Sequence, residues 1–488
     1  MNLSKSKYIN GVQCKKKLWL EQNKPEEKEN IDNESIFKTG NFIHEVAKYL
    51  FDNHININFS ENLNDMIKDT QYTIESYDKV VITEASFNYD NNFCSVDILK
   101  KIGSKYEMYE VKGTVTVKDV YIKDASYQYY VLKSLGLNIQ KCFIVILNKD
   151  YERHGNLDLN KLFIKVDVTE SVEQLFDEVK ENIYTFNKIL IKSTEPDDDI
   201  DSKCFKPYPC PFYNYCTKHL PQPNIFDIAD MHLSSKLKLY KEGIVSYKDV
   251  LKQDINQDLK QQIEYELYDK EPYINKHEIR KFMNTLSYPL YFLDFESYQQ
   301  PIPLFDNVRP YQQVPFQYSL HFIKEEGKEL KHTEFLGDGV NDPRKDLALK
   351  LVHDIPKDVC VVAYNMSFEK GIIKNLANIY PDLKDHLMNI HDNIKDLIVP
   401  FNHKYYYSKS LKGLSTIKYV LPALYPDDPS LNYHNLDMIH NGSEAMSSYA
   451  NLKDLSNEEQ EKIRYNMLKY CELDTYAMVK IWEFLKQI

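Results

Sequence analysis

Asp97, Glu110 and Lys112 have the residue types and the spacing that phosphodiester cleavage requires. Two carboxylates make a hard oxygen site suited to Mg²⁺ or Mn²⁺, and a neighbouring lysine can orient water or offset the charge that builds on a phosphate. An isolated pattern of this kind is more often a surface salt bridge on a hairpin. The hypothesis of a metal-dependent nuclease therefore depends on the residues that accompany it.

The element that must position these residues is a predicted hairpin. Two runs rich in β-branched and aromatic residues flank Gly103-Ser104, which predicts strands near 93–100 and 106–112. Because side chains alternate along a strand, Glu110 and Lys112 point to the same face. Asp97 can join them across the hairpin.

Two further polar residues lie on segments with helical periodicity. His44 belongs to 40–51, where a histidine is often a satisfied core residue but here is a candidate metal ligand near the hairpin. Gln128 lies on a helical stretch that ends at Gly136, and it could satisfy backbone groups or hold a nucleotide or the lysine. A buried strand follows from Lys141, so we expect a mixed α/β core.

Three cysteines, Cys204, Cys210 and Cys216, stand with five residues between each pair in a loop rich in proline and aromatic residues. This pattern indicates a metal or cluster loop, for which three thiolates need a fourth ligand. Cys14 is the natural candidate because it would tie the start of the chain to this loop. Zinc held by four thiolates is the alternative, and spacing alone does not separate the two.

The final part of the chain carries a second set of acids. An apolar strand ends in Asp294-Phe295-Glu296, and a second buried strand at 359–364 leads into a helix with Glu369 in its first turn. Tyr470 and Asp474 lie four apart on one face of an amphipathic helix. Four carboxylates suffice for two divalent ions, and the tyrosine could orient the attacking water.

Composition limits the classes of function. The 488 residues are 43% apolar and 13% aromatic, which leaves room for two or three domains. A net charge of −12 argues against a protein that coats nucleic acid nonspecifically, but not against a nuclease whose metal sites concentrate carboxylates. We see neither a signal peptide nor an apolar run of membrane-spanning length, so we expect a cytoplasmic location and no membrane partner.

The hairpin acids and lysine, together with His44, Gln128 and the cysteines, resemble the RecB-type PD-(D/E)XK exonucleases that hold an iron–sulfur cluster. Examples of this family are the CRISPR-associated RecB-like exonucleases and the AddB nuclease domain. The resemblance covers 1–220. It implies that His44, Asp97 and Glu110 bind Mg²⁺ or Mn²⁺, with Lys112 and Gln128 assisting. It also implies a [4Fe-4S] cluster on Cys14, Cys204, Cys210 and Cys216, although the family usually has C-x2-C-x5-C where this chain has C-x5-C-x5-C.

The second pattern, at 286–488, resembles the DnaQ-like exonucleases of the DEDDy subtype. This resemblance implies that Asp294, Glu296, Glu369 and Asp474 bind the metal ions and that Tyr470 assists, with Glu369 standing where the family generally has Asp. Over its whole length the chain is similar to bacterial proteins in which a RecB-like nuclease with cysteines precedes a YFLDFES-type exonuclease domain.

The sequence thus predicts an α/β protein with a restriction-endonuclease-like domain at 1–220 and an RNase H-like (DnaQ-like) domain at 286–488. Between them, 221–285 is expected to be a helical linker that resembles helix-hairpin-helix pieces. The expected function is a DNA exonuclease with two active sites in DNA processing, repair or defence, with DNA ends or single strands as its partner. The alternatives are a ribonuclease, a nucleic-acid-binding adaptor with one inactive nuclease domain, and a redox sensor.

Overall fold

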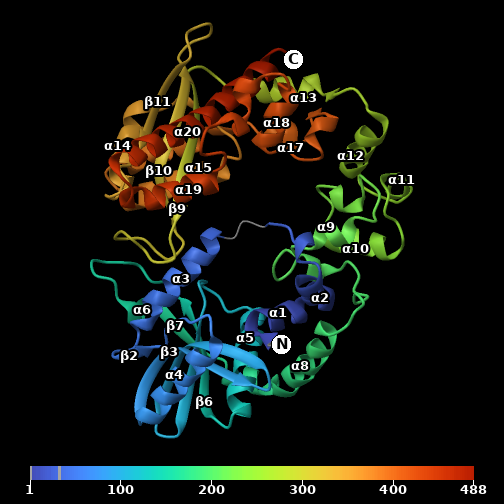
Figure 1. Cartoon of the computed structure of the whole chain (residues 1–488). Coiled ribbons are helices and arrows are strands. Elements are labelled where there is room, and N and C mark those ends of the chain that lie inside the picture. The colour runs from blue at the N-terminus through green and yellow to red at the C-terminus, as the bar shows by residue number, and fades with distance from the viewer. Residues whose placement is uncertain (1–2, 31–33) are drawn as a thin grey trace. The chain divides into compact units, whose positions relative to one another are not determined.

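The computed structural model of this chain describes residues 3–30 and 34–488 (Figure 1). Within these residues the strands form two large sheets and one small strand pair. The first compact unit comprises Met1–Leu220 together with Pro301–Tyr311, and the second comprises Pro221–Gln300 together with Gln312–Ile488. The prediction of a mixed α/β chain is confirmed.

The large sheet of the first unit has a central antiparallel meander, β3–β4–β5, followed by a helix, α5 (Asp119–Ser134), and a strand, β6, that runs parallel to β5. The predicted hairpin is β4–β5, and Gly103 in its turn has a φ of +60°, which glycine adopts without strain. The strands, in the order of the sheet, are β2 (His54–Asn56), β3 (Lys79–Tyr89), β4 (Asn92–Ile102), β5 (Lys105–Val111), β6 (Asn138–Leu147) and β7 (Phe163–Asp167), with β1 (Leu3–Ser4) paired to β4.

Apolar side chains cover both faces of this sheet. On β5, Met108 contributes to the core beneath α5, whereas Tyr109 and Val111 contribute to the core beneath α3, as the alternation of side chains along a strand requires. The other helices of this unit are α1 (Lys5–Gln13), α2 (Lys15–Asn23), α3 (Glu34–Lys48), α4 (Leu63–Ser76), α6 (Leu159–Leu162), α7 (Thr169–Gln174), α8 (Phe176–Leu190) and α9 (Tyr213–Thr217).

The segment 301–311 belongs to the first unit, although the sequence analysis assigned it to the final domain with the rest of 286–488. Ile302 is 5% exposed and lies in the core beneath α3. The guanidinium of Arg153 donates from Nη1 to the carbonyl oxygens of Pro303 and Leu304, each at 2.8 Å. This segment is therefore held by both apolar and polar contacts.

The far end of the same segment reaches the residue that follows Lys112. The Tyr311 hydroxyl donates to the carbonyl oxygen of Gly113 at 2.6 Å. A Cβ atom at Gly113 would lie 2.6 Å from Cδ1 of Ile43, so a side chain at this position would push against α3. Gly113 thus allows the end of β5 and the helix that carries His44 to approach closely.

The large sheet of the second unit also mixes strand directions. β9, β10 and β11 are antiparallel, whereas β12 and β13 run parallel to β9. The long helix α20 (Asn457–Lys486) contacts β9, β10 and β11 (Figure 1). In the order of the sheet the strands are β11 (Lys331–Leu336), β10 (Gln313–Ile323), β9 (Leu290–Gln299), β12 (Cys360–Ala363) and β13 (Ile394–Asp396), and β8 (Tyr273–Ile274) pairs separately with β14 (Tyr406–Tyr407).

The segment 221–285, predicted as a linker, is helical and belongs to the second unit. It has a small core of its own that includes Ile228, Val250 and Ile263. Gln262 donates to the carbonyl oxygen of Lys412 at 3.0 Å, which joins these helices to the rest of the unit. The helices of the second unit are α10 (Leu233–Lys241), α11 (Tyr247–Val250), α12 (Gln257–Tyr268), α13 (Lys276–Met283), α14 (Arg344–Asp354), α15 (Ser367–Ile379), α16 (Lys384–Asp392), α17 (Val399–Asn402), α18 (Ile417–Leu424), α19 (Gly442–Asn451) and α20 (Asn457–Lys486).

Among the described residues, no helix has both the length and the apolar character needed to cross a membrane.

Ile302→Ala should lower the free energy of unfolding of the first unit by about 2–5 kcal/mol, because it removes buried methyl groups and leaves a cavity. Trp482→Phe provides the background, since Trp19 is then the only tryptophan and reports on the first unit in urea titrations. Leu304→Ala is the matched control, because that side chain is 44% exposed. Equal midpoints for the two variants would contradict the assignment of this segment to the core.

Candidate functional site

The first set of predicted residues meets where β4, β5 and α5 lie together. Ile98 pairs with Tyr109, so the next positions along the hairpin, Asp97 and Glu110, face each other. Gln128 reaches the same place from α5, and its Nε2 donates to Glu110 Oε2 at 2.7 Å. The hairpin register and the helix that follows it therefore assemble the site.

Glu110 is fully buried and is surrounded by hydrogen-bond donors. Its Oε1 accepts from the ammonium of Lys112 at 2.7 Å and from the ammonium of Lys5 at 2.8 Å. Burial alone would raise the pKa of Glu110, but the two ammonium groups outweigh it and hold the pKa well below its usual range. Glu110 is thus an ionised carboxylate in a dry environment.

Asp97 is buried beside two residues from other elements. Its Oδ2 accepts from the backbone N–H of Val111 at 2.7 Å, and its Oδ1 lies 3.7 Å from Nδ1 of His44 on α3. Glu84 on β3 lies opposite Asp97 on β4, because the neighbouring pairs Thr83–Ile98 and Ala85–Val96 have the same register. Glu84 has a φ of +59°, a left-handed conformation that is strained for a residue with a side chain. Burial and the charge of Asp97 raise the pKa of Glu84.

Lys112 is held by a second carboxylate, that of Asp124 on α5, at 2.5 Å. Burial raises the pKa of Asp124 although two lysines lower it. Asp124 Oδ1 and Gln128 Oε1 are buried and have no hydrogen-bond partner among the described residues. Gln128 donates to Glu110, and Asp124 accepts from Lys112, so both side chains belong to this cluster and add oxygen atoms of the kind that a hard cation prefers.

Sequence reasoning missed Lys5, Glu84 and Asp124. Asp124 could have been found, because it lies four residues before Gln128 on one face of the predicted helix. No local pattern marks Lys5, which is 105 positions from Glu110, or Glu84, whose role comes from its strand neighbour.

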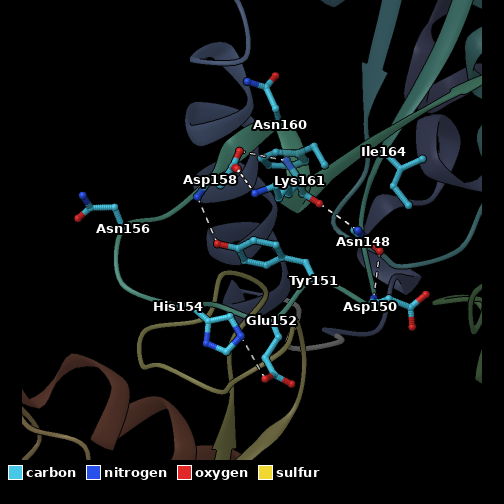
Figure 2. A pocket seen from close by; sticks show the side chains of 11 residues that line it. Asn148, Asp150, Tyr151, Glu152, His154, Asn156, Asp158, Asn160, Lys161 and Ile164 are labelled. Atoms are coloured by element: carbon cyan, nitrogen blue, oxygen red, sulfur yellow. Dashed lines mark hydrogen bonds and ion pairs between the residues drawn. The ribbon is translucent and has the colours of Figure 1, made fainter.

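A cavity of about 490 Å³ opens onto this site. It is lined by Ser4, Lys5, Ser6, Asn41, His44, Glu45, Glu84, Phe93, Cys94, Ser95 and Asp97. Figure 2 shows a different cavity of the first unit, of about 420 Å³, formed by residues of the segment 148–164. There the Tyr151 hydroxyl accepts from the backbone N–H of Asp158 at 3.2 Å, and none of the predicted site residues is among the described residues that line it.

The second set of predicted residues also comes together. Asp294 and Glu296 on β9 and Asp474 on α20 each offer a carboxylate oxygen within 4.8 Å of the others. Glu369, in the first turn of α15, is buried, and its Oε2 has no hydrogen-bond partner within the described parts of the chain. Its charge contributes to the raised pKa values of Asp294 and Glu296, so it lies close to both.

These acids destabilise one another's charged forms. Burial and then the charges of Asp474, Glu296 and Glu369 raise the pKa of Asp294 well above its usual range. Burial and Asp474 raise the pKa of Glu296 to about 8, and burial raises the pKa of Glu369 to about 8. Burial also raises the pKa of Asp474 to about 6. Divalent cations would relieve this repulsion.

Two tyrosines and one lysine accompany Asp474. The Tyr433 hydroxyl donates to Asp474 Oδ1 at 2.6 Å, and Tyr470 also hydrogen-bonds Asp474. The ammonium of Lys418 lies 5.5 Å from the centre of the Tyr433 ring and 5.9 Å from that of the Tyr470 ring. Tyr433 and Lys418 were missed, because neither has a sequence neighbour that indicates its place.

Three of the four predicted thiols, Cys204, Cys210 and Cys216, have raised pKa values. Burial and then neighbouring charges, including those of other cysteines, raise the pKa of Cys216 to about 12, and the pKa values of Cys204 and Cys210 are raised in the same direction. Cys14 is among the interacting cysteines in each case. Gln13 ties the start of the chain to the loop, because its Nε2 donates to the carbonyl oxygens of Lys203 and Tyr208, each at 2.8 Å.

The metal-free second unit should lose stability as the pH rises. Because the pKa values of Glu296, Glu369 and Asp474 are higher in the folded state than their ordinary values of 4.5, 4.5 and 3.8, folding favours the protonated forms. This stability is complete below about pH 4 and is lost as the pH rises through 6 to 8.

Thermal unfolding of a Trp19→Phe variant, followed by Trp482 fluorescence in EDTA between pH 5 and 8.5, tests this expectation. Each kcal/mol lost should lower the midpoint by about 2–4 °C, and Mn²⁺ should restore more at pH 8.5 than at pH 5. The Asp294→Asn variant should show a smaller fall. A midpoint that rises with pH in EDTA would contradict the arrangement of acids.

In comparisons with known proteins, this chain is similar to one protein family and to two relatives whose descriptions give no function. The profile of a family described as "Domain of unknown function (DUF2779)" matches residues 291–416, which include Asp294, Glu296 and Glu369. The uncharacterized protein MG366 of Mycoplasma genitalium is 29% identical over 230 residues, which cover 43% of this chain and 34% of that protein. The uncharacterized protein UU173 of Ureaplasma parvum is 27% identical over 263 residues, which cover 49% of this chain and 37% of that protein. The chain thus spans about a third of the length of the curated relatives it matches.

Proposed function

We propose that this chain is a metal-dependent nuclease with two active sites and that it acts as an exonuclease on DNA. The observation that carries the proposal is the convergence of Asp294, Glu296 and Asp474, with oxygen atoms within 4.8 Å of one another, beside the buried Glu369. Acids that raise one another's pKa values are a costly arrangement unless a cation binds them.

The topology of the second unit supports this proposal. Its antiparallel β9–β10–β11 sheet, extended by the parallel strands β12 and β13, agrees with an RNase H-like domain of the DnaQ type. The acids come from the first strand, from the helix after β12 and from the last helix, in the chain order that the DEDDy resemblance implies.

The residues of this site fit a pair of divalent ions. Asp294, Glu296, Glu369 and Asp474 would hold Mg²⁺ or Mn²⁺, which when bound supplies activated water and offsets charge on the phosphate. Tyr470 would orient the attacking water through its hydroxyl. Tyr433, which donates to Asp474 Oδ1, would keep that carboxylate in a fixed orientation.

The first site supports a second cleavage centre. The meander β3–β4–β5, then α5, then a parallel β6 agrees with a restriction-endonuclease-like core. His44, Asp97 and Glu110 would hold the metal ion, and Glu84 lies where it could add a carboxylate. Gln128 fixes Glu110 through Oε2, and Lys112 fixes it through Oε1.

The cysteines support a cluster site that would join the start of the chain to the loop at 204–216, with zinc held by four thiolates as the alternative. The charges of Lys16, Lys17 and Lys203 act on these thiols and would balance an anionic [4Fe-4S] centre. We propose that it clamps Cys14 to the loop at 204–216, in a reducing compartment such as the cytoplasm.

Cleavage assays on labelled single- and double-stranded DNA and RNA with Mn²⁺ test the two sites separately. Asp97→Asn and Asp294→Asn should each lower one of two cleavage activities at least ~100-fold, because each removes a metal ligand. The exposed Asp177→Asn and Asp385→Asn are matched controls and should keep full activity. Cleavage of RNA alone would replace the DNA exonuclease with a ribonuclease, and binding without cleavage would overturn the enzyme.

Anaerobic purification tests the cluster. We expect a brown protein with bound iron and absorption near about 400 nm, as iron–sulfur proteins in general show. Cys210→Ser should lose the colour and destabilise the first unit, because the cluster joins segments far apart in sequence. Cys360→Ser, on β12 of the second unit, is the control and should keep the iron. A colourless protein with one zinc ion would refute the cluster.

A further inference from the structure

We propose that Lys5, rather than Lys112, is the residue of the first site that contacts a phosphate of the bound strand. This inference rests on the nuclease activity proposed above. It assigns a substrate-contacting role to the start of the chain, which carries no recognisable catalytic pattern.

The two lysines share Glu110 but differ in what else they touch. Lys112 donates to two carboxylates, Glu110 at 2.7 Å and Asp124 at 2.5 Å, and its ammonium lies 5.5 Å from the centre of the Tyr121 ring. Within the part of the chain that the structure describes, the ammonium of Lys5 makes one hydrogen bond, to Glu110 at 2.8 Å, and lies 3.9 Å from Asp124. An ammonium has three N–H donors, so Lys5 retains donors for a phosphate oxygen.

The cavity distinguishes the two lysines further. Among the described residues that line it, Lys5 is the one lysine, and it shares the wall with His44 and Asp97. Lys112 is not part of that wall. A strand that enters the cavity toward the proposed metal ligands therefore meets Lys5.

The acidic side chains that line the cavity make a lysine in its wall favourable for phosphate binding. Glu45, Glu84 and Asp97 line the same space and would repel a phosphodiester. A lysine outside the wall of this cavity offsets that repulsion less at the phosphate than one in the wall, where Lys5 lies. The position of Lys5 thus suits a phosphate contact more than a purely structural ion pair.

The backbone that carries Lys5 is firmly anchored. Leu3 is fully buried, and Leu3 and Ser4 pair with Asn92 and Phe93 on β4. The Tyr127 hydroxyl from α5 donates to the Leu3 carbonyl oxygen at 2.6 Å. Lys5 therefore begins α1 at a fixed place beside Glu110, as a substrate contact requires.

The salt dependence of binding measures a phosphate contact directly. Affinity of the full-length protein for a fluorescent single-stranded DNA is measured in EDTA at several salt concentrations. Each phosphate neutralised contributes about 0.7 to the slope of log affinity against log salt for single strands. Lys5→Met and Lys5→Gln should lower this slope by about 0.7, whereas Lys5→Arg should keep it.

The controls separate this role from a structural one. Lys112→Met removes the other ammonium from Glu110 and should leave the slope unchanged, as should Lys7→Met two positions further along α1. Lys5→Gln can still donate to Glu110, so its fold should survive even where that of Lys5→Met does not. First-site cleavage, assayed with the Asp294→Asn change present, should fall at least ~100-fold in Lys5→Gln at saturating DNA and recover in part in Lys5→Arg.

The outcomes distinguish this inference from the function it rests on. If the wild type cuts DNA and Lys5→Gln keeps the wild-type slope, Lys5 does not contact phosphate. A drop of about 0.7 in Lys112→Met instead would return the role to Lys112. A wild type that cuts no nucleic acid overturns the nuclease and this assignment together.

Discussion

The burial of carboxylates beside one another is the constraint on which the rest of the structure depends. An ionised acid removed from water requires a cation or several hydrogen-bond donors. The first unit meets this need around Glu110 with two ammonium groups and an amide. The second unit gathers Asp294, Glu296 and Asp474 with little such compensation, and their raised pKa values record the difference. The proposed metal ions would therefore stabilise the second site more than the first.

Both sites are built from segments distant in sequence. In the first, β4 and β5 provide acids, α3 provides a histidine, α5 provides an amide, and the first residue of α1 is a lysine. In the second, a strand and a helix separated by most of the unit meet at Asp294 and Asp474. The sheets determine which residues come together, because strand register and side-chain alternation place each side chain on one face of the sheet. The proposed chemistry therefore depends on strand register as much as on residue identity.

The sequence predicted those elements whose structure depends mainly on residues near to one another in the chain. The β4–β5 hairpin, with Gly103 in its turn, follows from its own residues, and Tyr470 and Asp474 share a helix face because they are four apart. Lys5, Glu84 and Tyr433 could not be predicted, because each acquires its role from a tertiary neighbour. The same holds for 301–311, whose place in the first unit depends on contacts with Arg153 and Gly113.

That discontinuity has a consequence for biosynthesis. The first unit includes Ile302 and Tyr311, so its core cannot be completed on the ribosome when Leu220 emerges. At about 5–20 residues per second, the intervening chain takes roughly 5–18 s to make. During that interval the surface beneath α3 stays open to solvent and to chaperones. A first unit that is expressed alone and ends near residue 220 would lack the segment 301–311, so this part of its core would stay open. The two units are therefore expected to remain encoded in one chain.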